Sequence, residues 1–185
     1  MRIILVKHCQ EMSHLRTGDP PLSEEGWEEA KALKLPLGQE ERIRAIGSSV
    51  AARCLQTAAA LVESFRTAEC IEPLQGVTDR RNRMPDGTLV AADGTEVEPS
   101  GFLELQQSAI QTLEEFACNF FAPGEDFSAV VVTHRTVIAA VLAFLEGIKT
   151  EEEIGRYMGE HYNELAQPQI INVEEGGEGS VYLRK

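Results

Sequence analysis

Positive charge is scarce in this chain of 185 residues. It has 17 Lys and Arg residues against 30 Asp and Glu residues, which gives a formal net charge of -13. Proteins that bind nucleic acids use a basic face to neutralise phosphates, so this balance argues against a nucleic-acid partner. It does not exclude a small anionic substrate, because a few local cations can outweigh the field of the whole surface.

Several other signals are missing. The cysteines form no Cys-x-x-Cys pair, so we expect reduced thiols in a cytoplasmic protein and neither a disulfide framework nor a metal site. No apolar run is long enough to cross a membrane, and the start of the chain lacks the features of a signal peptide. We therefore expect no membrane partner. No feature of the sequence sets an oligomeric state. The four cysteines are Cys9, Cys54, Cys70 and Cys118.

The composition that remains is typical of a soluble globular protein. Hydrophobic residues make up 43% of the chain and charged residues 25%. We expect one domain, 1–185, that is large enough to bury a core without cross-links. Apolar runs predict strands at 2–6, 44–49, 69–72, 127–133, 169–173 and 181–183. Helices are predicted at 24–35, 51–65, 102–121, 136–145 and 150–158. This alternation indicates a three-layer α/β/α sandwich with a mostly parallel sheet.

The first predicted helix has clear entry signals. Ser23 is a predicted N-cap, and Glu24 and Glu25 fall in the first turn, where the helix dipole favours them. Leu22 and Trp27 could form a hydrophobic staple across this cap. The Glu24, Glu25, Glu28 and Glu29 side chains are expected to form the solvent face of this helix.

The segment 76–101 breaks the pattern of strands and helices. It contains turn signals and is long for a connection in a compact domain, so we interpret it as a surface hairpin or an irregular excursion. Such segments often serve as lids or binding loops. It also carries Arg80, Arg81 and Arg83, for which both a solvated role and a contact with substrate remain open.

Two predicted strands end on histidine: Val6 leads through Lys7 to His8, and Val132 leads through Thr133 to His134. The carboxyl ends of parallel strands meet at one edge of a sheet, where ligands bind in open α/β folds. A third strand exit, at 48–58, leads into a helix with Arg53 in its first turn. We expect free backbone amides at that helix start, and a guanidinium suited to phosphate.

These segments resemble the histidine phosphatase superfamily, which includes the cofactor-dependent phosphoglycerate mutases. Five blocks of the family appear in the right order, and the tail 169–183 resembles its closing hairpin. The opening Arg-His-Gly-Glu block is matched by Lys7-His8-Cys9-Gln10, and the late Ser-His-Gly block by Thr133-His134-Arg135. Between them, the Asp-x-Pro-Leu-Thr-x-x-Gly block is matched by 19–26 and the Ser-Pro-x-x-Arg-x-x-x-Thr-Ala block by 49–58. The Glu-x-x-x-Gly block is matched by 72–76.

The resemblance implies a phosphomonoesterase that acts on a small phosphorylated metabolite through a phosphohistidine intermediate, without a cofactor or metal. His8 would be the nucleophile and Glu72 the proton donor, with Asp79 as a rival for that role. Lys7, Arg53 and His134 would bind phosphate. A phosphatase is preferred over a mutase because mutases of this family are usually longer.

Departures from the family pattern cluster at the same centre. Lys7 replaces arginine and loses its bidentate fork, and Cys9 replaces a glycine, where a side chain is expected to crowd the pocket. Cys9 is interpreted either as a reactive thiol or as a small packing residue. Gln10, His14, Arg80 and Arg135 are candidate substrate contacts. These changes motivate an alternative function, a catalytically impaired phosphate-binding or regulatory protein on the same fold. His161 and Tyr162 are expected to pack or to face solvent after a helix end.

Overall fold

The fold is organised around a central sheet of six strands. The computed structural model describes residues 1–12, 15, 19–38, 42–65, 71–79, 81–83, 88–91, 93–98, 100–122, 127–177 and 180–185, with the backbone alone at 82, 83 and 89. Six strands form one sheet in the order β3-β2-β6-β1-β7-β8. They are β1 (Arg2–Lys7), β2 (Ile43–Ser49), β3 (Ile71–Leu74), β6 (Ser128–Thr133), β7 (Gln169–Glu175) and β8 (Val181–Arg184).

The direction of the strands confirms a mostly parallel sheet. β1 and β2 both run parallel to β6, and β3 runs parallel to β2. β7 is antiparallel to β1, and β8 is antiparallel to β7, so the tail forms the expected hairpin. The carboxyl ends of four parallel strands therefore meet at one edge of the sheet.

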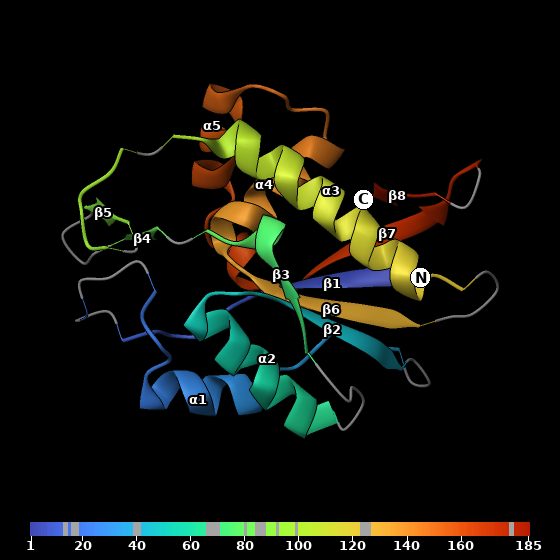
Figure 1. The fold of residues 1–185 in the computed structure, drawn as a ribbon, viewed down its shortest axis with the longest axis horizontal. Coiled ribbons are helices and arrows are strands. Elements are labelled where there is room, and N and C mark those ends of the chain that lie inside the picture. The colour runs from blue at the N-terminus through green and yellow to red at the C-terminus, as the bar shows by residue number, and fades with distance from the viewer. Residues whose placement is uncertain are drawn as a thin grey trace.

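Helices cover both faces of the sheet and complete the three layers (Figure 1). On one face lie α1 (Glu24–Lys31) and α2 (Ala52–Phe65). On the other lie α3 (Phe102–Phe120) and α4 (Arg135–Leu145), with α5 (Glu151–Glu160) packed against them. Two short 3-10 turns, η1 (Gln75–Val77) and η2 (Glu164–Ala166), connect elements near the sheet edge. The predicted α/β/α sandwich is confirmed.

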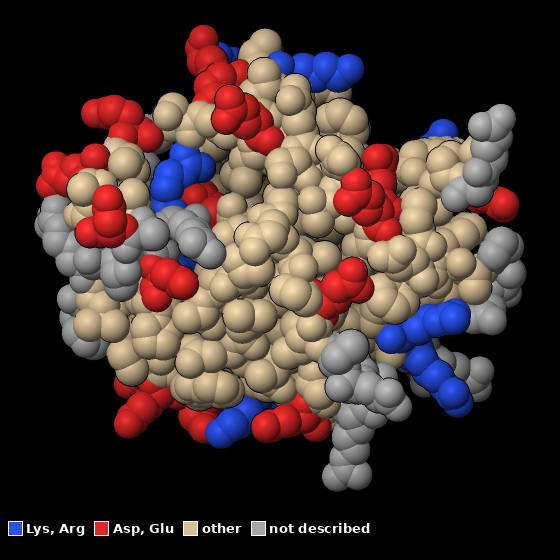
Figure 2. Space-filling view, viewed as in Figure 1, with Lys and Arg blue, Asp and Glu red and all other residues tan. Residues whose placement is uncertain are grey.

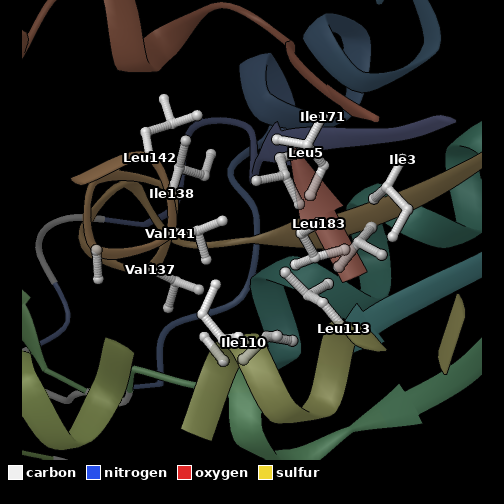
Figure 3. Close-up of a cluster of buried hydrophobic side chains, with 14 of the residues drawn as sticks. Ile3, Leu5, Ile110, Leu113, Val137, Ile138, Val141, Leu142, Ile171 and Leu183 are labelled. Carbon is white, nitrogen blue, oxygen red and sulfur yellow. The ribbon is translucent and has the colours of Figure 1, made fainter. Parts of the chain in front are cut away.

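Two hydrophobic clusters fill the spaces between these layers. The larger cluster joins β1, β7 and β8 to α3 and α4 (Figure 3). Ile3 and Leu5 point into it from β1, while Ile4 and Val6 point to the opposite cluster beneath α2. This alternation follows from the two-residue period of a strand. It explains why β1 is apolar on both faces, as buried parallel strands are.

Two predicted boundaries were wrong. The first helix begins as expected, since the Ser23 hydroxyl accepts a hydrogen bond from Gly26 N at 3.1 Å, but it ends at Lys31 and not near residue 35. Beyond its end, Leu33, Leu35 and Leu37 pack against the cluster under α2. The third strand, predicted at 69–72, is described as Ile71–Leu74 and so continues past residue 72 to include Pro73, while residues 69 and 70 lie outside the described residues. A proline is tolerated there because β3 is an edge strand.

The excursion at 76–101 contains a small sheet of its own. β4 (Asn82–Arg83) and β5 (Leu89–Val90) pair antiparallel, and Val90 forms a further bridge with Glu96. The described residues thus form the hairpin that the turn signals predicted. In Figure 1 this segment lies beside the loop that follows β1, at one end of the sheet.

Candidate active site

The two strand-end histidines are adjacent in the structure. His8 N donates a hydrogen bond to Thr133 O at 2.9 Å, which extends the β1–β6 pairing one residue beyond the strands. The rings of His8 and His134 lie 5.4 Å apart, centroid to centroid, in an edge-to-face arrangement. Both are buried, with 7% and 4% of their surfaces exposed. The prediction that the imidazoles converge is therefore confirmed.

Arg53 joins the two rings from the first turn of α2. Its Nε donates to His8 Nε2 at 3.2 Å, and its Nη2 lies 3.2 Å from His134 Nδ1. The same Nη2 donates to the backbone carbonyl of Asp79 at 3.2 Å. The side chain is 2% exposed. Because a guanidinium can only donate, both histidine nitrogens that face it must be unprotonated acceptors.

The remaining contacts set the tautomer of each histidine. On His8, Nδ1 carries the proton, since it lies 2.8 Å from Cys9 O and 3.2 Å from a carboxylate oxygen of Glu11. Its Nε2 lone pair therefore points at Arg53. On His134, Nε2 carries the proton and donates to Ser49 Oγ at 2.9 Å. Ser49 Oγ donates to Thr78 Oγ1 at 3.1 Å, which donates onward to Leu74 O.

Burial and neighbouring cations keep both rings neutral. Burial, followed by the positive charge of Lys7, lowers the pKa of His8 well below its usual value. Burial and the charge of Arg53 lower the pKa of His134 to about 3. A neutral imidazole with an exposed lone pair is the form that can act as a nucleophile.

The loop after β1 is fastened to α2, which keeps His8 in place. Cys9 N donates to Thr57 Oγ1 at 3.1 Å, and Leu22 N donates to Gln56 Oε1 at 2.7 Å. The Cys9 side chain is 1% exposed and packs in a cluster that contains Leu22, not in the cavity wall. The expectation that Cys9 crowds the pocket was wrong. Burial raises the pKa of its thiol to about 11, which favours the packing interpretation.

The start of α2 differs from the expectation of free backbone amides. Ala52 N donates to Asp19 Oδ1 at 2.7 Å, Ala51 N donates to Ser49 Oγ at 3.3 Å, and Val50 N donates to Thr78 Oγ1 at 3.2 Å. These three amides are already satisfied by side chains. At this point the Arg53 side chain, and not these three amides, is the group that could contact an anion.

A cavity of about 830 Å³ opens over the two histidines. Four cations, Lys7, Arg53, Arg81 and Arg135, line it together with three carboxylates, Glu11, Glu29 and Asp79. Figure 2 shows that acidic side chains elsewhere are scattered over the surface and not gathered into one patch on this face. The outer wall of the cavity is partly apolar. The other lining residues are His8, Gln10, Phe102, His134, Thr136, Met158, Gly159, Tyr162 and Ala166.

Asp79 is the carboxylate most firmly built into the cavity. It is 6% exposed and accepts hydrogen bonds from Arg81 Nε at 2.8 Å and Thr136 Oγ1 at 2.6 Å. Burial alone would raise the pKa of Asp79, but the hydrogen bonds and the charge of Arg81 lower it overall. Arg81 also donates to Ser100 O and lies 5.4 Å from the centre of the Phe102 ring. Arg81 therefore ties the two ends of the excursion together beside the cavity.

Glu72 does not reach this cavity. It lies on β3 opposite Gly47 of β2 and is absent from the described cavity lining. A Cβ at Gly47 would meet Leu74 and Phe116, so this face of the strand points toward α3. The family block at 72–76 places Glu72 two residues before the end of β3, too early to reach the edge where the histidines lie.

The other predicted site residues divide into two groups. Lys7, predicted to bind phosphate, lines the cavity together with Gln10 and Arg135, which were predicted to contact substrate. Lys7 Nζ donates to the His8 carbonyl at 2.8 Å. His14 and Arg80 lie outside the described residues, as does the side chain of Arg83.

Two residues that were predicted to face solvent or to pack are exposed, and both also line the cavity. Glu29, predicted on a solvent face, lines the cavity and accepts a hydrogen bond from Gln10 N at 2.9 Å. Tyr162, predicted to pack or to face solvent, lies under the Arg135 guanidinium, 3.7 Å from ring centre to carbon. No local pattern signals either contact, because both depend on how distant elements pack.

Among the described residues, no group of three or more His, Cys, Asp or Glu side chains is placed to hold a metal ion. None of the helices in the described part of the chain is both long and apolar enough to span a bilayer.

A buried histidine pair bridged by an arginine, at the carboxyl edge of a mostly parallel sheet, defines an α/β protein with a cation-lined cavity at that edge. The model of the histidine phosphatase superfamily, branch 1, matches residues 3–165. The chain belongs to this superfamily. No curated protein sequence matches it.

Solved structures share the fold at low sequence identity. Bacillus stearothermophilus YhfR is 17% identical, with a TM-score of 0.64 over 98% of this chain and 94% of its own. A mycobacterial glucosyl-3-phosphoglycerate phosphatase in complex with VO3 is 17% identical, with a TM-score of 0.66 over 99% and 96%. The protein histidine phosphatase SixA in complex with tungstate is 15% identical, with a TM-score of 0.57 over 100% and 95%.

Proposed function

We propose that this protein hydrolyses phosphomonoesters of small molecules through a phosphohistidine on His8. The observation that carries the proposal is the state of His8: a buried neutral ring with Nδ1 engaged and Nε2 facing Arg53. Two structurally similar proteins were solved with VO3 and tungstate, which are oxyanions like phosphate. The free thiols Cys9, Cys54 and Cys118 fit a reducing compartment such as the cytoplasm.

Arg53 occupies the positions that phosphate oxygens would take. In the free protein its guanidinium donates to acceptor nitrogens of both histidines. When a phosphate group enters, Arg53 turns its donors to the phosphate oxygens and releases the Nε2 lone pair of His8. Lys7 adds a second positive charge, so the negative charge of the transferring group is balanced as it spreads over three oxygens.

The first chemical step forms a bond between His8 Nε2 and phosphorus. The ester P–O bond breaks, and its electron pair goes to the leaving oxygen, which needs a proton. We assign this proton to Asp79 in place of Glu72, because Asp79 lines the cavity and Glu72 does not. A phosphate dianion nearby raises the pKa of a carboxyl group, so substrate binding promotes the protonated form of Asp79.

The second step regenerates the enzyme. Water attacks the phosphorus of phosphohistidine, the N–P bond breaks, and its electrons return to His8 Nε2. The Asp79 carboxylate takes the proton of the attacking water, which is the reverse of its first role. Inorganic phosphate then leaves.

Trapping of the intermediate tests the proposal. A phosphomonoester with labelled phosphorus, mixed with the protein and quenched in base, should leave label on His8 that is lost in acid. His8→Ala should carry no label and should hydrolyse 4-nitrophenyl phosphate at the buffer rate. Equal hydrolysis by wild type and His8→Ala would exclude the proposed mechanism.

A second candidate function is phosphate binding with little turnover. Lys7 favours it, because its ammonium donates to the His8 carbonyl and cannot clamp two phosphate oxygens as an arginine fork can. A Lys7→Arg, Cys9→Gly double variant separates the two functions. A large gain in hydrolysis from an inactive wild type would establish the binding role, whereas an active wild type excludes it.

A further inference from the structure

Arg135 is a cation of the cavity whose Nε has no hydrogen-bond partner among the described residues. It begins α4 directly after His134, and it replaces the glycine of the family block. Its Nε is buried and makes no hydrogen bond, and no ion pair with it is found in the part of the chain that the structure describes. A buried donor without an acceptor is destabilising, so an acceptor supplied by a ligand would be favourable there.

The other cations that line the cavity are engaged. Arg53 contacts both histidines and the Asp79 carbonyl, Lys7 donates to a backbone carbonyl, and Arg81 pairs with the Asp79 carboxylate. Of the four described cations, Arg135 therefore needs the least rearrangement to take an anion from a ligand.

Tyr162 holds the Arg135 guanidinium in one plane. The guanidinium carbon lies 3.7 Å from the centre of the Tyr162 ring, a close cation–π contact. A guanidinium that lies on an aromatic face keeps its edge free to form paired hydrogen bonds with a carboxylate. Tyr162 is 50% exposed, so this pair lies toward the mouth of the cavity.

The wall beside Arg135 accepts an apolar group. Phe102 and Met158 line the same cavity, as do Tyr162 and Ala166. A ligand that reaches from the histidines to Arg135 passes these side chains. The lining thus combines cations at the bottom, apolar surface along the wall and a further cation at the rim.

We propose that Arg135 and Tyr162 form a second-anion subsite, which selects phosphomonoesters that carry a carboxylate on an apolar, planar body. The carboxylate accepts hydrogen bonds from the Arg135 edge, including the unpartnered Nε after a small rotation of the side chain. This inference rests on the proposed function, since the phosphate group of the same ligand occupies the site between His8 and His134.

Binding of phosphonates tests the subsite independently of turnover. Benzylphosphonate is compared by calorimetry with its 3- and 4-carboxy derivatives and with the matching carboxamides, which have the same shape without the charge. The two positions sample two distances from the phosphonate. We expect one carboxylate to bind about 10- to 100-fold more tightly than its carboxamide, as for a hydrogen bond to a charged group.

Variants assign this preference to Arg135. Arg135→Met should reduce it to about threefold or less, and Arg135→Lys, which keeps the charge without the fork, should retain part of it. Tyr162→Leu should weaken it several-fold. Arg156→Met is the matched control, because Arg156 lies on α5 in an exposed ion pair with Glu152. It should keep the full preference. If Arg135→Met fails to fold, the ratio of carboxylate to carboxamide affinity in Arg135→Lys is the test.

Equal affinity for carboxylates and carboxamides in the wild type would overturn the subsite, and so would a preference that survives in Arg135→Met. Failure of the proposed function gives a different result. In that case phenyl phosphate is hydrolysed equally by wild type and His8→Ala, while the phosphonate preference can persist. If no phosphonate binds, both the subsite and the proposed function are overturned.

Discussion

Arg53 Nε donates a hydrogen bond to His8 Nε2 at 3.2 Å, so the guanidinium covers the lone pair that would attack phosphorus. The same side chain determines which nitrogen of each histidine carries the proton. Arg53 therefore has two effects, because it covers His8 Nε2 and because its charge, after burial, adds to the lowering of both histidine pKa values.

Replacement of Arg53 tests this double role. Arg53→Lys keeps a positive charge but lacks the rigid N–H donors of a guanidinium, so it cannot contact both histidines and the phosphoryl group at once. We expect kcat/KM for 4-nitrophenyl phosphate to fall by about 10²–10³-fold, the usual cost of removing one donor to a developing charge. Arg44→Lys, an exposed change on β2, is the control and should leave the rate unchanged. A similar rate in both variants would contradict the assignment.

The lowered pKa values of His8 and His134 predict a loss of stability in mild acid. The unfolded chain binds protons at these residues below about pH 6.5, while the folded chain does not until far lower pH. The free energy of unfolding should therefore fall as pH drops from 6.5 to 5, by up to about 1.4 kcal/mol per pH unit for each histidine. Asp79 does not contribute in this window, because its pKa is lowered from 3.8.

Urea unfolding at several pH values measures this effect. His134→Asn should lose about half of the slope, since only His8 then remains buried and neutral. A wild type as stable at pH 5 as at pH 7.5 would contradict the buried neutral state of both rings.

A leaving-group series tests Asp79 as proton donor. An alkyl phosphate needs a proton on its leaving oxygen, whereas 4-nitrophenolate leaves without one. Asp79→Asn should therefore slow alkyl phosphate hydrolysis by roughly 10²–10⁴-fold and affect 4-nitrophenyl phosphate much less. Glu72→Gln is the matched comparison. If Glu72→Gln produces the selective loss instead, the proton donor is Glu72.

Gly26 allows the loop after His8 to pack on α1. A Cβ at this position would lie 1.9 Å from the Gln10 carbonyl oxygen, a backbone atom that cannot swing away. Gly26→Ala should cost about 1–3 kcal/mol of unfolding free energy and also reduce activity. In Gly155→Ala on α5, the added Cβ would contact only Phe102, at 3.7 Å, so this variant should be neutral or stabilising. Chemical denaturation of both variants compares them directly.

The packing of Cys9 predicts that its thiol is unreactive. Burial raises the pKa of Cys9 to about 11, and that of Cys54 to about 12, so little thiolate forms at pH 8. Iodoacetamide should modify the exposed Cys118 first, and peptide mapping should find Cys9 and Cys54 unmodified in the native protein. Rapid modification of Cys9 would support its interpretation as a reactive thiol.

Much of the site could be predicted because its residues follow strong local signals. His8 and His134 come directly after apolar, β-branched runs, and parallel pairing with one register brings such residues together. Arg53 stands in the first turn of a helix that follows a strand exit. In each case the sequence predicts the local strand or helix clearly, and the topology of an open α/β sheet then brings these residues to one edge.

The remainder depends on tertiary contacts that leave no local pattern. Glu72 fits a family block by spacing, yet its place on an edge strand turns it toward α3. Asp79 reaches the cavity only because Arg81 and Thr136 hold it. Tyr162 enters the site through the packing of the segment after α5 on α4, and no residue near it in the chain indicates this.

The contacts of Arg81 determine which changes the excursion at 76–101 can tolerate. Arg81 bonds Asp79, near the start of the excursion, and Ser100, which comes 19 residues after Arg81 itself and lies near the end of the excursion. One side chain therefore joins the two ends of this segment. We expect substitutions between 82 and 99 to leave this junction, and the residues around His8 and His134, in place.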